Sequence, residues 1–467
     1  MKRYTTLVIL LFAFLFTSAQ VQYTINYRDS SSSTIQVTIE PETALKAPLS
    51  FVMPRSIPGT YGITLYDQFV HKLTAVTANG ERVAMVKDAS DAPRWYVNDN
   101  SKVIARIEYE VDLNRMERKM APADASIIRS GFAGLLNYSI LGWIDGTQLL
   151  PVKCTVNTFE NWPVFSSHFP STQPGKGSYA FVIDNYYTLA DGQLFLGPRF
   201  HIKEFAAVVP LYIVSYSQTQ DEFLDDYGWQ GTYSMGILND YFGEVPFKNY
   251  TIFLRSAIPA EPGNAPPFGM EHLQSSTFFG DVSAIRKTAM SPEDRIRTMP
   301  TFLHHMGHSF IPLRCYGDAY RPFALEIAPI INNIWFNEGF MWFLPYDTLH
   351  LAMMKTRFDK NVYNTAPAIK NMTLQQLSQT ASTQYAVDFR LGQGIYSRGA
   401  LMALEMNAWL KEQSGGKKSM KDVLRYLYQW SKKNRRPFTL EEFPTLISQA
   451  CGIDLRKIYD KWQLPIE

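Results

Sequence analysis

The sequence predicts a multidomain α+β protein, with an N-terminal β domain of sandwich or saddle-like shape, a mixed central domain and an all-α C-terminal lobe. The chain has 467 residues, 46% of them hydrophobic and 14% aromatic, which is enough for two or three domains with large cores. Alternating apolar and polar residues dominate as far as about Phe200, and this alternation indicates half-buried strands. Beyond about Thr373 the apolar residues recur at helical spacing, which indicates the C-terminal helices.

Residues 1–19 have the pattern of a bacterial-type secretory signal peptide. Lys2 and Arg3 provide its positive start, residues 7–16 are all apolar, and Ala19 ends a stretch of small residues suited to cleavage. This apolar run is too short to cross a bilayer, and no other segment is long and apolar enough to do so. We therefore expect an exported protein, periplasmic or secreted, with no membrane span after cleavage.

The charge of the chain gives no sign of a nucleic-acid partner. The formal net charge is +2, and it falls to zero once Lys2 and Arg3 are removed with the signal peptide. A chain that binds nucleic acid normally carries an excess of clustered basic residues. The balance of charge therefore argues against that class of partner.

Residues 20–204 are expected to form the N-terminal β domain. Short alternating runs such as 34–39 and 103–111 indicate strands, and Asn-Gly and Asp-Gly pairs mark turns between the runs. This part of the chain contains no constellation of residues that suggests catalysis. Taken alone, it would be interpreted as a binding or packing module.

Residues 205–370 are expected to form the central domain. Strands are predicted at 208–216 and 250–254, on either side of a helix over 219–242.

Two further helices are predicted in this domain, and they carry the histidines and the glutamate discussed below. Ser291 followed by Pro292 and two acidic residues predicts a helix start, because Ser caps the helix and Pro fits its first turn. Pro300 leaves open whether this helix kinks there or only begins there, and we expect it to end near Pro312. The second helix is predicted over 330–344.

Residues 371–467 are expected to form the C-terminal helical lobe. The predicted helices cover 396–411, which Gly415 ends, a segment beginning at Ser419, the run after a capping box at Thr439, and 455–462.

The most informative pattern is the H-H-x-x-H at residues 304–308. His304 and His308 are four apart, so on a helix they share one face and could bind one metal ion. Glu338 is a lone carboxylate in an apolar helix, where it is costly unless it is paired or bound to a metal. His304, His308 and Glu338 would form the His₂Glu set typical of catalytic zinc. Two simpler interpretations stay open, namely a polar helix face and a metal-free hydrogen bond between glutamate and histidine.

The three cysteines, Cys154, Cys315 and Cys451, are odd in number and widely spaced. They predict neither a disulfide framework nor a C-x-x-C metal site. Cys315 follows His308 closely enough to approach the metal, but a small buried residue is the simpler interpretation.

Several segments together resemble peptidase family M61, the glycyl aminopeptidase-like family of the gluzincin clan. The resemblance covers most of the mature chain, and its strength lies in the order and spacing of the segments. In chain order, these segments are residues 53–61 (MPRSIPGTY), 189–194 (LADGQL), 269–272 (GMEH, with Ser275 just after), 304–308 (HHMGH), 335–340 (WFNEGF) and 396–400 (YSRGA). The resemblance implies a thermolysin-like central domain.

The resemblance also implies a role for each matching position. His304, His308 and Glu338 would bind one Zn²⁺. Glu271, with Gly269 and Met270 beside it, would bind the free amino group of a peptide substrate. Tyr396 would donate its hydroxyl to the developing oxyanion.

Two departures from the family pattern bear on activity. His305 stands where the family has the glutamate that acts as general base, and losing such a base costs about 10²–10⁴ in rate. We also expect no C-terminal PDZ-like domain of the kind that family members often carry, since the predicted helical lobe extends to the last residues of the sequence. We therefore expect an M61-type metallopeptidase fold that binds the N-terminus of short peptides and has impaired hydrolysis. The alternative is an inactive pseudopeptidase that acts as a peptide- or protein-binding module.

Overall fold

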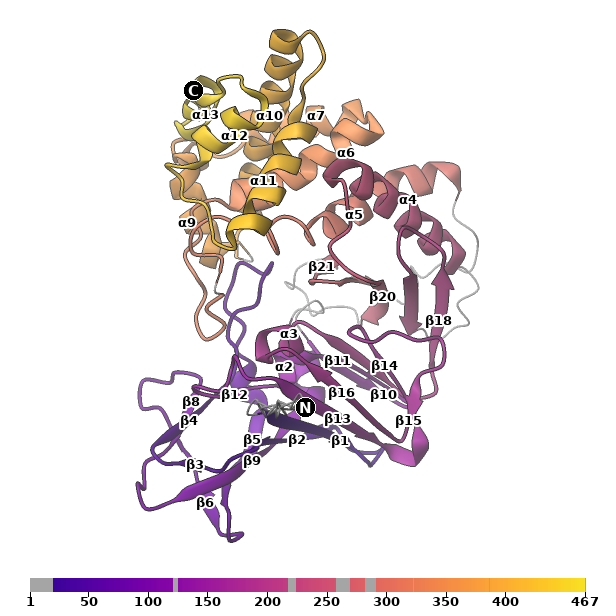
Figure 1. Cartoon of the computed structure of the whole chain (residues 1–467), viewed down its shortest axis with the longest axis vertical. Coiled ribbons are helices and arrows are strands. Elements are labelled where there is room, and N and C mark those ends of the chain that lie inside the picture. The colour runs from indigo at the N-terminus through magenta and orange to yellow at the C-terminus, as the bar shows by residue number, and fades with distance from the viewer. Residues whose placement is uncertain are drawn as a thin grey trace, which may run out of the picture.

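The computed structural model describes residues 20–120, 125–216, 224–257, 269–281, 291–321, 323–385 and 387–466. The predicted signal peptide lies outside these residues. Figure 1 shows a strand-rich N-terminal part at one end, a mixed central part, and a C-terminal lobe of helices at the other end. This arrangement confirms the predicted multidomain α+β class. The predicted domain boundaries, 204/205 and 370/371, stay predictions.

The N-terminal part is built from three sheets. The largest runs in the order β16 (Ser178–Ile183), β13 (Val152–Thr158), β1 (Val21–Tyr27), β2 (Thr34–Pro41), β9 (Val103–Asp112), β5 (Val70–Thr77) and β6 (Arg82–Ala84), with β3 (Leu45–Lys46) paired to β9. The second runs in the order β10 (Ile127–Arg129), β11 (Phe132–Leu136), β17 (Gln193–Leu196), β14 (Pro163–Ser166) and β15 (Gly175–Lys176), and the third β12 (Trp143–Ile144), β4 (Leu49–Val52), β8 (Arg94–Val97) and β7 (Val86–Lys87). Short helical segments join them: η1 (Tyr66–Phe69), α1 (Leu113–Lys119), α2 (Asn137–Ile140), η2 (Phe159–Asn161) and α3 (Tyr186–Ala190).

The central sheet carries the segments that later meet at the site. Its order is β18 (Phe200–Phe205), β19 (Leu211–Tyr216), β20 (Tyr250–Ala257), β22 (Ser275–Asp281) and β21 (Gly269–Glu271). The strands predicted at 208–216 and 250–254 are confirmed as β19 and β20. These two strands are parallel, and α4 (Leu224–Phe242) connects them, as parallel strands require a crossover.

Aromatic packing joins the central sheet to the N-terminal part. Phe132 of β11 stacks on Tyr216 of β19 with ring centroids 3.8 Å apart, and Phe195 of β17 lies 4.8 Å from Phe253 of β20. These rings belong to a buried hydrophobic cluster that draws on both sheets. The N-terminal part therefore packs directly against the central sheet.

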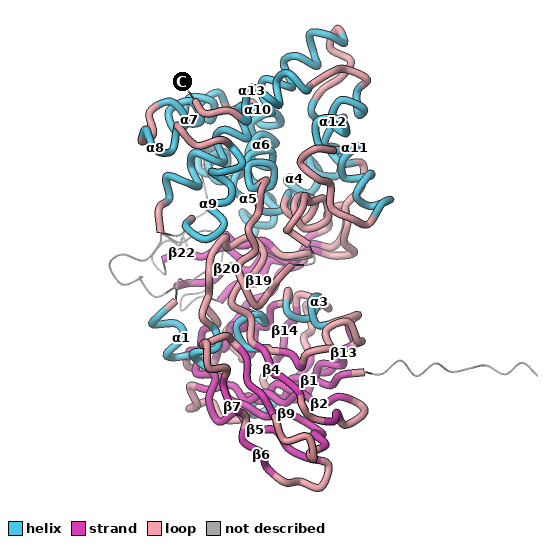
Figure 2. The backbone as a smooth tube through the Cα atoms, turned by 90° about the vertical axis from the view of Figure 1, so that its left-hand side faces the viewer, coloured by secondary structure: helices cyan, strands magenta, loops and turns pink. Residues whose placement is uncertain are grey.

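The helices of the remaining chain lie on the side of the central sheet away from the N-terminal part (Figure 2). They are α5 (Pro292–Gly307), the π-helix η3 (Trp335–Phe340), α6 (Met341–Leu349), α7 (Ala352–Tyr363), α8 (Pro367–Lys370), α9 (Leu374–Gln384), α10 (Phe389–Ser414), α11 (Met420–Asn434), α12 (Phe443–Cys451) and α13 (Arg456–Gln463). Within the described ranges, no helix combines the length and the apolar character needed to cross a membrane.

The predicted start of α5 is confirmed, but its predicted end is wrong. Ser291 caps the helix by accepting a hydrogen bond from the amide of Asp294, and Pro292 occupies the first turn. The helix runs through Pro300 as a single element. It ends at Gly307, five residues before Pro312, because the last turns tighten to i→i+3 bonds and carry Phe310 into the core.

Two other helices have different limits from those predicted. The helix expected at 330–344 begins at Trp335 as a π-helical turn, and the one expected at 396–411 covers Phe389–Ser414. The helix α10 begins before Tyr396 because Asp388 caps it by accepting a hydrogen bond from the amide of Arg390. Gly339 of η3 lies directly against Gly399 of α10, where any side chain would collide with the other backbone, so the two glycines allow these helices to touch.

The capping signals of the C-terminal lobe are confirmed. Gly415 ends α10 with φ of 61°, in the left-handed region that favours glycine. Ser419 and Asp422 form a capping box at the start of α11, and Thr439 exchanges hydrogen bonds with Glu442 before α12.

Candidate active site

Three ligand-type side chains from two helices meet at one point. His304 lies in the last turn of α5 and His308 caps that helix, so both rings emerge on the same side. Glu338 reaches them from η3. The Nε2 atoms of the two histidines are 3.0 Å apart, and Glu338 Oε2 lies 3.3 Å from His304 Nε2 and 3.4 Å from His308 Nε2. All three side chains are buried.

These separations fit a tetrahedral metal site. Zinc binds nitrogen and oxygen ligands at about 2.0–2.1 Å, which places neighbouring tetrahedral ligands about 3.3 Å from each other. The ring of His308 is oriented by its Nδ1, which donates to the carbonyl of Ile311 at 2.9 Å and leaves Nε2 as the nitrogen that could bind a metal. The ring of His304 stacks on Trp342 with centroids 4.2 Å apart. The three residues therefore form a group that could hold a metal ion.

The charge states of these groups depend on one another. Burial, and then His308, lower the pKa of His304 to about 4. Burial would lower the pKa of His308 as well, but Glu271 and Glu338 outweigh it and raise that pKa to about 9. Burial would raise the pKa of Glu338, and the two histidines instead hold it well below its usual range. Without a metal, a proton on His308 balances the Glu338 carboxylate, so metal binding must displace that proton.

The ring of His305 faces Glu271 rather than the point where the Nε2 atoms of His304 and His308 meet. Its Nδ1 lies 3.3 Å from Glu271 Oε2, and its ring meets Phe278 edge-on at 5.4 Å. The other side of the ring lies against Gly269, where an added Cβ would be only 2.7 Å from His305 Nε2. Two residues that the sequence assigned to separate roles, the base position and the amine-binding glutamate, therefore contact each other.

Glu271, His305 and His308 form a second group whose ligand atoms lie within 4.8 Å of one another. The two groups share His308. Because Nδ1 of His308 donates to Ile311, only its Nε2 is free, and a metal bound in one group would deny that nitrogen to the other.

A loop of the N-terminal part completes the site, and the sequence did not reveal its contribution. The Tyr61 hydroxyl donates to Glu338 Oε1 at 2.7 Å across 277 positions of the chain. Gly59 lies so close to Glu271 that a side chain there would collide with its carboxylate. Tyr61 has a positive φ of 44°, an uncommon backbone state for a residue other than glycine. The one sequence signal was the segment 53–61 itself, which the family resemblance singled out.

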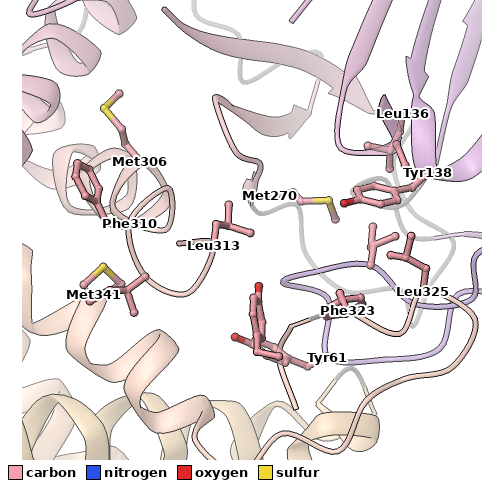
Figure 3. Close-up of a cluster of buried hydrophobic side chains, with 14 of the residues drawn as sticks. Tyr61, Leu136, Tyr138, Met270, Met306, Phe310, Leu313, Phe323, Leu325 and Met341 are labelled. Atoms are coloured by element: carbon pink, nitrogen blue, oxygen red, sulfur yellow. The ribbon is translucent and has the colours of Figure 1, made fainter. Parts of the chain in front are cut away.

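The loop is held in place by contacts at its base. The amides of Arg55 and Ser56 both donate to the carbonyl of Leu325, at 2.7 and 3.0 Å. Arg55 also donates two hydrogen bonds to the buried carboxylate of Asp67, at 2.8 and 2.7 Å. Figure 3 shows Tyr61 close to the loop that carries Phe323 and Leu325.

Tyr396 lies in the interior of α10, with its ring stacked on Tyr385 at 5.8 Å. Burial, and then the nearby Glu338 carboxylate, raise the pKa of Tyr396 well above its ordinary value, so its hydroxyl stays protonated. Tyr385 in turn meets Tyr61 edge-on at 6.2 Å. Three tyrosines thus surround the Glu338 side of the site.

The remaining predicted positions flank Glu271 on β21. Gly269 provides the close approach to His305 described above. The side chain of Met270 is buried and lies beside Tyr138 in the hydrophobic cluster of Figure 3. The substrate-binding role expected for these two residues stays a prediction. Cys315 is buried and free, in keeping with the simpler interpretation.

The strand that carries Glu271 is anchored to the N-terminal part through a buried acid. Asp191 accepts a hydrogen bond from the Leu273 amide at 2.7 Å and lies 3.2 Å from Nδ1 of His272. Both side chains are buried. Two of the segments that carry the resemblance to M61, 189–194 and 269–272, therefore lie in contact in the folded chain.

Comparisons with known proteins agree with this geometry. Residues 22–197 match the family model described as the peptidase M61 N-terminal domain. No curated protein matches the chain in a direct search.

Solved structures share the fold at low sequence identity. The aminopeptidase N family protein from Idiomarina loihiensis has a TM-score of 0.80 and 18% identity, over 96% of this chain and 76% of that one. A variant of the M1 zinc metallopeptidase from Deinococcus radiodurans, bound to a Tyr-Ser-Ala substrate, has a TM-score of 0.55 and 14% identity, over 96% and 94%. Native yeast LTA4 hydrolase has a TM-score of 0.53 and 13% identity, over 96% and 68%.

The chain therefore has the multidomain fold of the M1 and aminopeptidase N-type zinc metallopeptidases. Over residues 22–197, the chain matches the model of the peptidase M61 N-terminal domain. The predicted resemblance to M61 is confirmed.

Proposed function

We propose that this protein is a zinc-binding member of the aminopeptidase-like metallopeptidases that binds the N-terminus of short peptides and hydrolyses them poorly. The observation that carries the proposal is the convergence of His304, His308 and Glu338 at tetrahedral spacing, beside a histidine at the base position. The solved structures with this fold are zinc metallopeptidases, and one of them holds a peptide substrate, which supports zinc and peptide as the ligands.

His304, His308 and Glu338 would hold one Zn²⁺, which supplies Lewis-acid polarisation of a peptide carbonyl. Tyr61 orients Glu338 through its hydrogen bond, as groups behind metal ligands commonly do. Tyr396 carries a protonated hydroxyl on the same side and is suited to donate to a developing oxyanion.

Impaired hydrolysis follows from His305. A carboxylate at this position would accept a proton and become neutral, whereas an imidazole that accepts one becomes cationic close to a metal ion, which is unfavourable. The ring of His305 is also turned to Glu271 rather than left free. Loss of a placed base costs about 10²–10⁴ in rate.

The contact between His305 and Glu271 favours a second candidate function, an inactive peptide- or protein-binding module. Glu271 would bind the cationic amino group of a peptide through its carboxylate. Nδ1 of His305 already donates a hydrogen bond to one oxygen of that carboxylate, so the two groups compete for it. A peptide amine would have to displace this ring. We also propose that the protein acts after export, on the basis of the signal-like segment 1–19.

Metal analysis of the purified protein tests the zinc site. One zinc ion per chain is expected in the wild type and in the control variant His201→Ala, which removes an exposed histidine of β18, and none in His304→Ala. Zinc that is absent from the wild type, or unchanged in His304→Ala, would contradict the proposal.

Peptide binding then separates the two candidates. The zinc-loaded protein is titrated with a short peptide bearing a free or an acetylated N-terminus. Preference for the free amine supports N-terminal recognition by Glu271. Equal binding of both forms supports the inactive binding module, in which the hydrogen bond from His305 prevents Glu271 from binding the peptide amine.

A further inference from the structure

A large cavity outside the metal site lies where the three parts of the chain meet. The volume of this cavity is about 890 Å³, within the range of small-molecule pockets. It is lined by His168 and Phe169 from the N-terminal part, by residues of the central part that include 244–249, Arg314 and Arg321, and by the end of α11. None of His304, His308, Glu338 or Glu271 lines it, so the cavity is a separate feature.

The walls of this cavity carry an excess of positive charge. Its basic residues are Lys248, Arg314, Arg321, Lys432 and Arg435, and Glu244 is the one acid among its described lining residues. Glu244 is already paired with Lys432 at 2.6 Å. Burial lowers the pKa of His168 to about 4, so that ring adds no charge at neutral pH.

The other four cations have no ion-pair partner among the described residues. The single Nη1 atom of Arg314 donates to both Leu273 and Ser309, at 2.9 and 2.8 Å, which leaves its other nitrogens free for a ligand. Arg321 lies over the ring of Tyr316 at 5.9 Å, and its Nε is buried without a hydrogen-bond partner. Lys248 and Arg435 are exposed at the rim.

The charges are unfavourable as they stand. Arg314 and Arg321 repel each other, and this repulsion acts together with burial to lower the pKa of Arg314 to about 10. The nearby acid Asp191 is committed to His272 and the Leu273 amide. Planar guanidinium groups bind phosphate and carboxylate oxygens through paired hydrogen bonds, and a bound anion would relieve the repulsion.

We infer that this cavity binds a small organic anion with at least two negative charges, carried by phosphate or carboxylate oxygens. Arg314 and Arg321 contact the anionic groups at the base, while Lys248 and Arg435 attract the ligand at the rim. The rings of Phe247 and Tyr316 offer apolar surface for the rest of the molecule.

Calorimetric titration of the zinc-loaded protein with inorganic phosphate and with tricarballylate tests this inference. Both are anionic, and they separate a phosphate ligand from a polycarboxylate. Saturable binding of either probe is expected, weakened by added salt, with no binding of the neutral trimethyl ester of tricarballylate. Arg321→Gln should weaken binding about tenfold, because it removes a charge-assisted contact. Arg435→Gln should weaken binding severalfold, because it removes one of the charges that attract the ligand at the rim.

The matched control is Arg357→Gln, which removes an exposed arginine of α7 that does not line the cavity and should leave binding unchanged. Arg435 is exposed, so its variant tests the inference even where Arg321→Gln folds poorly. The inference is overturned if neither anion binds at about 10 mM. It is equally overturned if Arg435→Gln and Arg357→Gln bind alike.

Discussion

Replacing Tyr61 by phenylalanine deletes one hydroxyl and nothing else from the candidate metal centre. That hydroxyl donates to Glu338 Oε1 at 2.7 Å in a buried setting. Burial, and then Glu338, raise the pKa of Tyr61 well above its ordinary value, so it remains a donor throughout the working pH range. The change leaves the Glu338 carboxylate with one unpaired oxygen and freer to rotate.

The strength of this hydrogen bond sets the expected loss of zinc affinity. A hydrogen bond to a charged group contributes about 1.5–3 kcal/mol, and about 1.4 kcal/mol corresponds to a tenfold change in affinity. Tyr61→Phe should therefore weaken zinc binding by about 10- to 100-fold, the range typical of groups behind metal ligands.

Competition with a chromophoric zinc chelator measures this affinity. Tyr186→Phe is the matched control, since the Tyr186 hydroxyl is equally buried and donates to a neutral carbonyl, that of Leu141, also at 2.7 Å. This control should lose stability but keep its zinc affinity. Equal zinc affinity in Tyr61→Phe and the wild type would refute the reasoning, because the loop would then have no part in the metal centre.

Three further predictions concern the same region. Asp67→Asn should cost about 2 kcal/mol of stability at pH 7, because it breaks a mostly buried pair with Arg55. Burial would raise the pKa of Asp67, but Arg55 and Lys87 lower it. The Asp67 carboxylate therefore stabilises the fold above its pKa in the unfolded chain, and this stabilisation is lost as the pH falls. The loss of stability in Asp67→Asn, measured by urea unfolding, should accordingly become smaller below about pH 4. Gly59→Ala should lower stability, since its φ of +93° disfavours a side chain, and should also lower peptide affinity, since the new Cβ collides with the Glu271 carboxylate and displaces it. Unchanged peptide affinity would argue against a contribution of this loop to the site. Chelation should lower the melting temperature of the wild type by several degrees but not that of Glu338→Gln, and equal shifts would place the metal elsewhere.

The sequence predicts the parts of the site that depend on local spacing. His304 and His308 share a helix face by periodicity alone, and Glu338 stands out because a lone acid in an apolar helix needs a partner. The structure brings these three together. The start of α5 at Ser291 was equally readable, since capping depends on a few adjacent residues.

Features set by distant packing could not be read in the same way. Tyr61 reaches Glu338 only because the N-terminal part packs against the central sheet, and no local pattern records that contact. The rotation of His305 toward Glu271 depends on Gly269 and Phe278 beside it. The end of α5 is also set by packing, because the buried side chain of Phe310 and the tightened last turn stop the helix before Pro312.

We propose that this chain retains the fold and the metal ligands of a zinc metallopeptidase while His305 prevents efficient hydrolysis. The measurement that decides this is turnover of a short peptide with a small N-terminal residue by the zinc-loaded wild type and by His305→Glu, at equal zinc content. We expect the restored carboxylate to raise turnover by at least about 10², the lower end of what a placed base contributes. Wild-type turnover within about tenfold of that of His305→Glu would show that His305 does not limit hydrolysis.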